Sequence, residues 1–295
     1  MAELHRILVL GANGQVGWEL CRSLSVLGEV LPVARHAETD LAFDLAKVDA
    51  LPGFLDPLAP DVIVNAAAYT AVDKAESEPG LAFTLNAELP AALGEWAASR
   101  AVPVLHYSTD YVFDGTKSSP YTEDDSVGPV NVYGKSKLAG DQALLVSGAE
   151  AWILRVSWVY ARRGHNFLLT MQRLMQEREQ LSIVADQHGA PTWCRSIAEA
   201  SAAMLVQILR DPQCRRDTCG VYHAAPAGET SWYGFAEAIR ELGGYGCELQ
   251  PIDTRDYPTP AQRPLNSRLD SSKLRKIFGI ALPDWRTALG DCVAD

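Results

Sequence analysis

A glycine-rich segment near the amino terminus limits the fold of this chain more than any other feature. An apolar run at residues 7–10 leads into Gly-Ala-Asn-Gly-Gln-Val-Gly, from Gly11 to Gly17, and a helical pattern begins within that segment. Glycines there allow a tight turn, close approach of a diphosphate to the backbone, and close packing of helix on strand. The start of the helix offers unpaired N–H groups to phosphates. The order strand, turn and helix therefore predicts a dinucleotide-binding site.

Strand-like and helix-like runs alternate through the first half of the chain. Strands are predicted at residues 7–10, 29–33, 61–65, 102–107 and 152–156, and helices at 15–27, 87–99 and 132–146. Such alternation indicates parallel strands with helices on both faces of the sheet. The predicted fold is an α/β doubly wound parallel sheet of the Rossmann type, which binds ligands at the carboxyl ends of its strands.

The alternation loosens after about Tyr160. Helices are predicted near residues 167–179, 196–209 and 231–242, and a proline-rich loop at 257–264. We expect residues 1–160 to form an NAD(P)-binding domain, rejoined by about 190–225. Residues 161–189 and 226–295 are expected to form a smaller carboxyl-terminal substrate-binding lobe.

Charge and composition exclude several classes of protein. The formal net charge is −11, which argues against nucleic-acid binding because that depends on a basic surface. No run is apolar enough to cross a bilayer or to act as a signal peptide, so we expect a cytoplasmic protein without a membrane partner. The six cysteines lack zinc-ligand spacing and are expected to be reduced thiols.

The end of the second predicted strand bears on the choice of cofactor. An acidic residue there would bind the ribose 2′-hydroxyl of NAD, and an arginine would favour the 2′-phosphate of NADP. The chain has Arg35 and no carboxylate at that place, which favours NADPH, with NADH left open. A solvated arginine in a turn is the alternative. Asp44 could accept a hydrogen bond from the adenine amino group or cap a helix.

Two further motifs supply groups for carbonyl reduction. Tyr133 and Lys137 are four residues apart on a predicted helix, so they share one face. An ammonium beside a phenol lowers the pKa of the phenol and helps it to exchange a proton. The string Ser108-Thr109-Asp110 lies at the end of a predicted strand, where a hydroxyl can polarise a substrate carbonyl. A surface Tyr–Lys pair is the alternative, and the order of all three motifs argues against it.

Together with these residues, long strings resemble the dTDP-4-dehydrorhamnose reductases of the extended short-chain dehydrogenase/reductase family. The strings begin at the following residues: Gly14, Asp61, Ala71, Tyr107, Asn131, Arg155 and Tyr257. The resemblance extends from Ile7 to about Trp285. It implies reduction of the C4 carbonyl of dTDP-4-dehydro-L-rhamnose, in nucleotide-sugar biosynthesis for cell-surface polysaccharide.

The resemblance also implies roles for individual residues. Tyr133 would be the proton donor, Lys137 its partner and Thr109 the residue that polarises the substrate. The residues expected to bind the cofactor are Gly11, Asn13, Gly14, Gln15, Val16, Gly17, Arg35, Asp44, Leu45, Ala66, Ala67, Ala68, Tyr69, Thr70, Tyr133 and Lys137. The residues expected to bind the substrate are Ser108, Thr109, Asp110, Trp158, Arg263, Asn266 and Ser267. A core role is the alternative for Trp158, and Arg268 is the alternative to Arg263 for the diphosphate.

Some members of the family bind magnesium at a dimer contact built from glutamates. Glu19 matches one such position, but Arg195 stands where another glutamate would be expected. We therefore do not expect a magnesium-bridged dimer, although a homodimer is left open, and Glu19 is interpreted as a solvated helix residue.

Two other functions use the same fold. A sugar-nucleotide epimerase or dehydratase would recycle its cofactor, and a dehydratase needs a second acidic residue beside the catalytic hydroxyl. Thr109 is followed by Asp110 and Tyr111, without that second carboxylate. A non-catalytic regulatory subunit is the other alternative, and the presence of Tyr133 and Lys137 argues against it.

Overall fold

The computed structural model describes residues 5–35 and 41–295 and is built around a parallel sheet of six strands in the order β10-β5-β4-β3-β1-β2. The bounds are β1 His5–Leu10, β2 Gly28–Val33, β3 Val62–Asn65, β4 Val104–Thr109, β5 Ala151–Val156 and β10 Gly220–His223. All neighbouring strands in the sheet are parallel. The strand order reverses direction at β1, as in doubly wound folds, so the predicted fold class is confirmed.

The central strands are apolar because both of their faces are covered. Every residue of β3, β4 and β5 is buried. Side chains of β1 alternate between two cores, as the period of a strand requires. Ile7 and Val9 pack with Leu20 and Met204 on one face, whereas Leu8 packs with residues of the opposite face, including Leu89 and Leu144.

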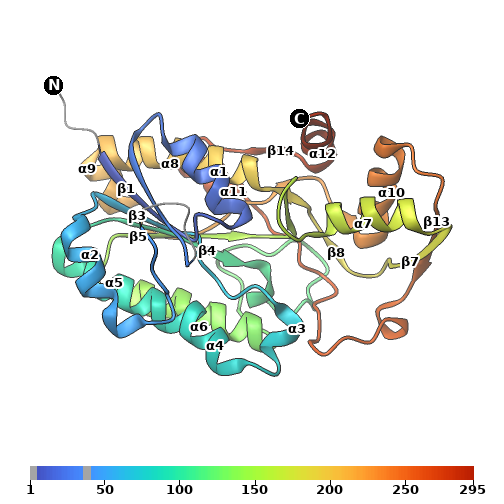
Figure 1. The fold of residues 1–295 in the computed structure, drawn as a ribbon, viewed down its shortest axis with the longest axis horizontal. Coiled ribbons are helices and arrows are strands. Elements are labelled where there is room, and N and C mark those ends of the chain that lie inside the picture. Colours follow the sequence, from blue (N-terminus) through green and yellow to red (C-terminus); the bar gives the residue numbers. More distant parts are fainter. Residues whose placement is uncertain (1–4, 36–40) are drawn as a thin grey trace.

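Helices cover both faces of this sheet (Figure 1). Helices α1 and α8 pack together on one face, and α5 and α6 pack together on the other. The longer helices are α1 Gln15–Leu24, α5 Leu89–Arg100, α6 Val132–Val146, α7 Phe167–Glu177, α8 Cys194–Arg210, α10 Trp232–Gly243 and α12 Trp285–Ala294. The short helices are α2 Leu51–Leu55, α3 Val72–Ala75, α4 Pro79–Phe83, α9 Pro212–Asp217 and α11 Ser272–Phe278.

A smaller lobe lies at one end of the large sheet, around α7 and α10 (Figure 1). Its strands β7 Gln180–Val184 and β13 Glu248–Ile252 form a parallel pair. A third apolar core, which includes Met171, Leu181 and Phe235, holds these elements together. The remaining strands are β6 Val159–Tyr160, β8 His188–Gly189, β9 Thr192–Trp193, β11 Pro226–Ala227, β12 Thr230–Ser231 and β14 Leu282–Asp284.

The predicted strands and helices are present with shifted ends, whereas several others, such as β7, β13 and α12, were not predicted. The predicted helix at 132–146 is matched by α6, but the helix predicted at 87–99 begins within a π-helical turn, Thr84–Glu88. The strand predicted at 102–107 extends to Thr109. Residues 257–264 form neither helix nor strand, as predicted. Strand β10 belongs to the segment expected to rejoin the first domain, and the exact domain boundaries stay a prediction.

Two further expectations concern bilayers and thiols. Within residues 5–35 and 41–295, no helix combines the length and apolar character needed to cross a membrane. All six cysteines are free, as expected for reduced thiols.

Helix α6 approaches the π-helical turn so closely that one position requires glycine. A Cβ atom at Gly140 would lie 2.0 Å from the carbonyl oxygen of Asn86. The contact is with backbone, which cannot rotate away as a side chain can. Gly140 therefore sets how near α6 comes to the chain that precedes α5.

We predict that Gly140→Ala lowers the free energy of unfolding by about 1–3 kcal/mol, because the helix must move outward. Gly290→Ala in α12 is the matched control, since a Cβ atom there meets no atom within 4 Å. Alanine should stabilise that helix by up to about 1 kcal/mol. Urea unfolding would measure both variants, and equal effects would contradict the interpretation.

Candidate active site

The glycine-rich turn after β1 is held against two neighbouring strands. The amides of Gly11 and Ala12 both donate to the carbonyl of Val33, at 3.0 Å. Gly11 has φ of 79°, and a Cβ atom there would lie 2.8 Å from the Ala67 backbone. A Cβ atom at Gly17 would lie 2.1 Å from the Gly11 carbonyl oxygen. The turn therefore tolerates no side chain at either position, and it brings α1 close to the sheet.

The start of α1 is suited to phosphate. The helix begins at Gln15 after Gly14 in extended conformation, no side chain caps it, and its first turn contains no acidic residue. Its first N–H groups, including that of Val16, have no partner within the helix. The side chain of Gln15 accepts a hydrogen bond from Asn166 Nδ2, at 2.8 Å, which holds the loop before α7 beside this turn.

Residues 66–70 form the opposite wall of the same space. The Ala66 amide donates to the Leu10 carbonyl at 3.0 Å, so this segment follows β3 directly beside the turn. Asn86 fixes its far end, because its side chain accepts from the Tyr69 amide at 2.8 Å and donates to the Tyr69 carbonyl at 3.0 Å. Ala67, Ala68 and Thr70 are thereby brought to the edge where β1 and β3 end.

Arg35 and Asp44 lie together beyond β2. Arg35 Nε is 3.6 Å from Asp44 Oδ1, and the Arg35 side chain is 56% exposed. Asp44 Oδ1 also accepts from the Ala46 amide in a local turn, and no helix is capped by it. Leu45 is buried beside them.

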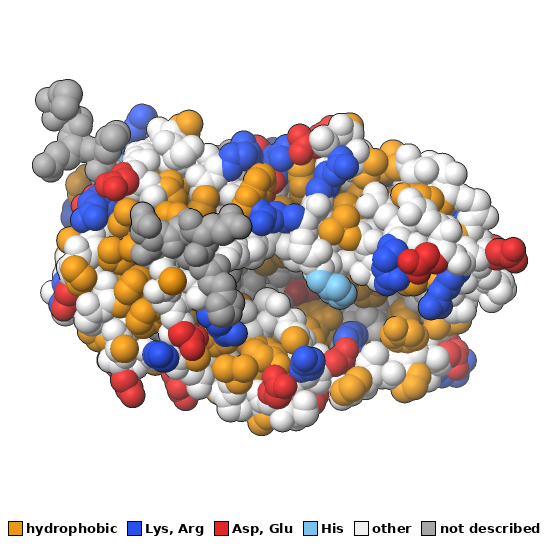
Figure 2. Space-filling model, viewed as in Figure 1, with side chains coloured by type: hydrophobic (Ala, Val, Ile, Leu, Met, Phe, Trp, Pro, Cys, Tyr) orange, Lys and Arg blue, Asp and Glu red, His pale blue; other side chains and the backbone are white. Residues whose placement is uncertain are grey.

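Figure 2 shows a hollow in the middle of the molecule, between the lobe of the large sheet and the smaller lobe. The carboxyl ends of the parallel strands and the start of α6 are the elements that carry the predicted catalytic groups. Asn131 caps α6, since its side chain accepts from the Gly134 amide at 2.8 Å. Glu76 Oε1 accepts from the Val132 amide at 2.9 Å. Both bonds fix the turn of α6 that carries Tyr133.

Lys137 is almost completely buried, at 1% exposure, between α6 and β4. Its Nζ donates to the Tyr107 carbonyl oxygen at 2.6 Å and lies 3.3 Å from His106 Nε2. Burial lowers the pKa of Lys137 to about 8, and the charge of Asp141, one turn further along α6, opposes this shift. A buried amine of this kind changes charge near neutral pH.

The structure corrects the expected effect of Lys137 on Tyr133. Burial raises the pKa of Tyr133 above its ordinary value, while a hydrogen bond with Thr109 lowers it. The lowered pKa expected for Tyr133 is not found, because burial outweighs the opposing contributions and Nζ of Lys137 donates to the Tyr107 carbonyl of β4. The phenol is protonated at neutral pH, but a raised pKa makes it a weaker acid, so a positive charge nearby is needed to favour proton donation.

The strand-end residues point in different directions. Thr109 donates its hydroxyl to Asp110 Oδ1 at 2.9 Å, and both residues are buried. Burial raises the pKa of Asp110 to about 7, against hydrogen bonds from Ser267 and Thr109 that lower it. Ser108 instead donates to Asp141 Oδ2 at 2.8 Å. The Ser108 hydroxyl is therefore directed toward Asp141 of α6 and not toward Asp110.

Trp158 connects the two lobes. It stacks on Trp232, the first residue of α10, with ring centroids 3.7 Å apart and planes 7° apart. Its backbone is left-handed, with φ of 44°, which is unusual for a bulky residue. A Cβ atom at Gly189 would lie 2.5 Å from the Trp158 ring. Trp158 is half-buried, so part of its side chain is accessible.

Both arginines considered for the diphosphate already have protein partners. Arg263 forms a bidentate pair with Asp73, at 3.0 and 2.8 Å. Arg268 donates to Glu229 Oε2 at 2.7 Å and to Asn266 Oδ1 at 2.8 Å. The amide of Asn266 donates to backbone carbonyls of the 117–119 loop. These contacts place residues 263–268 beside the site and leave the choice of arginine open.

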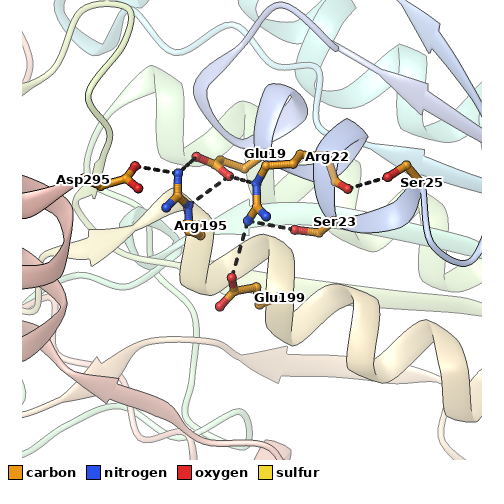
Figure 3. A network of polar contacts seen from close by, with 7 residues as sticks. All are labelled: Glu19, Arg22, Ser23, Ser25, Arg195, Glu199 and Asp295. Carbon is orange, nitrogen blue, oxygen red and sulfur yellow. Dashed lines mark hydrogen bonds and ion pairs between the residues drawn. The ribbon is translucent and has the colours of Figure 1, made fainter.

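The interpretation of Glu19 as a solvated residue was wrong. Glu19 is 5% exposed and accepts hydrogen bonds from Arg22 and Arg195, which joins α1 to α8 (Figure 3). Arg195 Nη2 also lies 2.8 Å from an Asp295 carboxylate oxygen. The guanidinium groups of Arg22 and Arg195 thus bind both carboxylate oxygens of Glu19. Glu19 with these two partners does not fit a magnesium ligand. In the described part of the chain, no group of three acidic, histidine or cysteine side chains could hold a metal.

Comparisons with known proteins identify the family of this chain. The family profile described as RmlD substrate binding domain matches residues 5–295. The chain belongs to this family. The dTDP-4-dehydrorhamnose reductase of Burkholderia thailandensis is 52% identical over 300 residues, covering 98% of each chain. The reductase of the same name from Escherichia coli K12 is 43% identical over 289 residues, covering 96% of this chain and 95% of the relative.

Solved structures of reductases from this group have the same fold. The dTDP-4-dehydrorhamnose reductase of Clostridium acetobutylicum has a TM-score of 0.88 at 33% identity and covers 98% of both chains. The Bacillus anthracis reductase, solved in complex with NADP, has a TM-score of 0.89 at 30% identity and covers 98% of this chain and 99% of its own.

Sequence reasoning missed several polar residues beneath the site of this RmlD-family chain. The most buried of these are Asn65, Asn86, His106 and Asp141. A polar residue within an apolar strand was the available signal, as for Asn65 after Val-Ile-Val and His106 after Val-Leu. Buried polar side chains need partners, so such interruptions indicate a network.

The Asp73–Arg263 pair joins α3 to the proline-rich loop, and Asp73 also accepts from the Ala261 amide at 3.2 Å. We predict that Asp73→Ala speeds hydrogen exchange of residues 257–264 roughly fivefold, because loss of a partly exposed charged pair costs about 1 kcal/mol. Glu177→Ala, which breaks the exposed pair with Arg173 on α7, is the control. Unchanged exchange in Asp73→Ala would show that the loop is held by other contacts.

Proposed function

We propose that this chain is an NAD(P)H-dependent reductase of the C4 carbonyl of dTDP-4-dehydro-L-rhamnose, with dTDP-L-rhamnose as product. The observation that carries the proposal is the convergence of Thr109, Tyr133 and Lys137 at the strand end beside an uncapped, glycine-lined helix start. The substrate is supported by relatives named dTDP-4-dehydrorhamnose reductase that match nearly the whole chain.

The cofactor side of the proposal uses the glycine turn and the wall opposite it. The backbone at Gly14–Gly17 would hold the diphosphate, Arg35 the 2′-phosphate, and residues 66–70 the nicotinamide half. The missing Cβ atoms at Gly11 and Gly17 and the uncapped start of α1 fit a dinucleotide. When bound, the reduced nicotinamide supplies the hydride. The expected cofactor is NADPH, with NADH as an alternative.

The protein groups supply the proton and orient the carbonyl. Tyr133, which is protonated at neutral pH, donates its phenolic proton to the developing C4 alkoxide. Thr109 lies within hydrogen-bonding reach of Tyr133 and Asp110, and it polarises the carbonyl. Lys137 in its charged form stabilises the phenolate that remains.

The substrate side uses residues from both lobes. Asp110 and Ser267 would bind sugar hydroxyls, and the half-buried ring of Trp158 would cover the apolar side of the deoxysugar. Residues 263–268 would bind the nucleotide part, where an arginine can bind a diphosphate through two hydrogen bonds. A cytoplasmic location is part of this proposal.

The activity test is net oxidation of NADPH in the presence of enzymatically generated dTDP-4-dehydro-L-rhamnose. A reductase consumes the cofactor stoichiometrically, whereas an epimerase or dehydratase returns it within each turnover. Binding of NADPH without turnover of any sugar nucleotide would favour the regulatory-subunit alternative.

We predict that Tyr133→Phe lowers kcat roughly 10²- to 10⁴-fold, because a positioned proton donor contributes that much. The dissociation constant for NADPH should change little, as measured by fluorescence titration. Tyr245→Phe, in the smaller lobe, is the control and should keep full turnover. Near-normal kcat in Tyr133→Phe would contradict the assigned proton donor.

A separate prediction concerns Arg35. Arg35→Ala should raise KM for NADPH roughly tenfold and leave KM for NADH unchanged, because one charge-assisted hydrogen bond to the 2′-phosphate contributes about 1.5 kcal/mol. Arg275→Ala, on α11 at the surface, controls for the loss of one positive charge. An equal rise for both cofactors would remove the argument for Arg35.

A further inference from the structure

A polar chain runs from β3 through β4 to α6 underneath the proposed site. Asn65 ends β3, His106 lies in the middle of β4, and Lys137 projects from α6. Their exposures are 1%, 0% and 1%. Asn65 Nδ2 is 3.1 Å from His106 Nδ1, and His106 Nε2 is 3.3 Å from Lys137 Nζ. The roles proposed above do not use Asn65 or His106.

The orientation of the Asn65 amide determines which nitrogen of His106 is protonated. Asn65 Oδ1 accepts from the Ala67 amide at 3.2 Å, so Nδ2 must be the atom that faces the imidazole. Nδ2 donates, and His106 Nδ1 therefore accepts. Burial and the charge of Lys137 lower the pKa of His106 well below its ordinary value and outweigh a hydrogen bond with the Asn65 backbone that raises it, so the ring is neutral and carries one N–H. That hydrogen is on Nε2, the nitrogen directed at Lys137.

An N–H group directed at Lys137 discriminates between the two charge states of the amine. An ammonium has three N–H groups and no lone pair, so it meets His106 Nε2–H as donor against donor. A neutral amine accepts from Nε2–H and still donates to the Tyr107 carbonyl at 2.6 Å. The imidazole thus favours the neutral form of Lys137.

Other charged and titratable groups act on the same amine. Asp141 on α6 favours the ammonium, but it is itself paired with Arg155 of β5 and accepts from Ser108. Tyr133, one turn before Lys137, and Tyr107 on β4 are both neutral because burial raises their pKa values. Asp141 and His106 therefore have opposite effects on the pKa of Lys137: Asp141 favours the charged amine, and His106 favours the neutral one.

We propose that Asn65 and His106 are positioning residues that act through Lys137: they direct a protonated Nε2 at its Nζ and thereby set the pH at which Lys137 loses its charge. The catalytic consequence rests on the proposed function. If charged Lys137 stabilises the Tyr133 phenolate, turnover falls as pH rises through the pKa of Lys137, and the Asn65–His106 pair determines where that alkaline limb lies.

The direct test is ¹⁵N NMR of histidine-labelled protein, which distinguishes a protonated from an unprotonated ring nitrogen and requires no turnover. The His106 signals are identified by their loss in His106→Gln. We expect the Nε2–H form at neutral pH. A ring protonated on Nδ1, or on both nitrogens, would overturn the proposal without any measurement of turnover.

The variant Asn65→Asp reverses the direction of the hydrogen bond between residue 65 and His106 with little change in side-chain shape. A carboxylate accepts from His106 Nδ1–H, so Nε2 then presents a lone pair to Lys137. The Lys137 pKa, followed by ¹³C NMR of the side-chain carbon next to Nζ and assigned by its loss in Lys137→Met, should rise by about one unit or more. The alkaline limb of kcat/KM should move upward equally.

Two controls separate this effect from a change of charge or of packing. The double variant Asn65→Asp with His106→Leu keeps the carboxylate without the imidazole, and it should show less than half of the rise in the Lys137 pKa. His106→Gln keeps an N–H donor toward Lys137 and should leave the limb within a few tenths of a unit. Equal rises in the single and double variants would overturn the proposal. A normal tautomer and titration without any reductase activity would overturn only the proposed function.

Discussion

A buried lysine amine between α6 and β4 is the constraint on which much of this structure depends. An amine out of water must find hydrogen-bond partners, and a charged one is costly to bury. Nζ of Lys137 donates to the Tyr107 carbonyl from α6, and Gly140 of the same helix packs against the Asn86 carbonyl. Asn86 also holds the loop that follows β3. The same contacts that position the amine therefore position one wall of the proposed cofactor site.

Several arginines of this acidic chain are held by carboxylates of other elements. Arg195 and Arg22 share Glu19 at the contact of α1 and α8, and Arg263 is held by Asp73 (Figure 3). Most of these guanidinium groups join elements that are distant in the sequence. Arg35, with a looser contact to its carboxylate and greater exposure, is better placed to exchange its partner for a phosphate.

The sequence was sufficient for five of the six strands of the large sheet, the glycine turn and the Tyr133–Lys137 helix, because each has a local pattern with a physical cause. It was insufficient where the outcome depends on contacts between distant residues. The direction of Nζ of Lys137, the burial of Glu19 and the pairing of Arg263 with Asp73 are of this kind. Some observed helix ends also differ from the predicted ones. The π-helical turn before α5 packs against α6, and local propensity does not reveal such a contact.

The stacked pair of Trp158 and Trp232 has an optical consequence. Two indoles 3.7 Å apart and nearly parallel couple their transitions, so their near-ultraviolet circular dichroism and fluorescence depend on the exact stacking geometry. One ring belongs to the segment after β5, and the other begins α10 of the smaller lobe. The protein thus carries an intrinsic chromophore at the junction of its lobes, and any movement of one lobe against the other alters its spectrum.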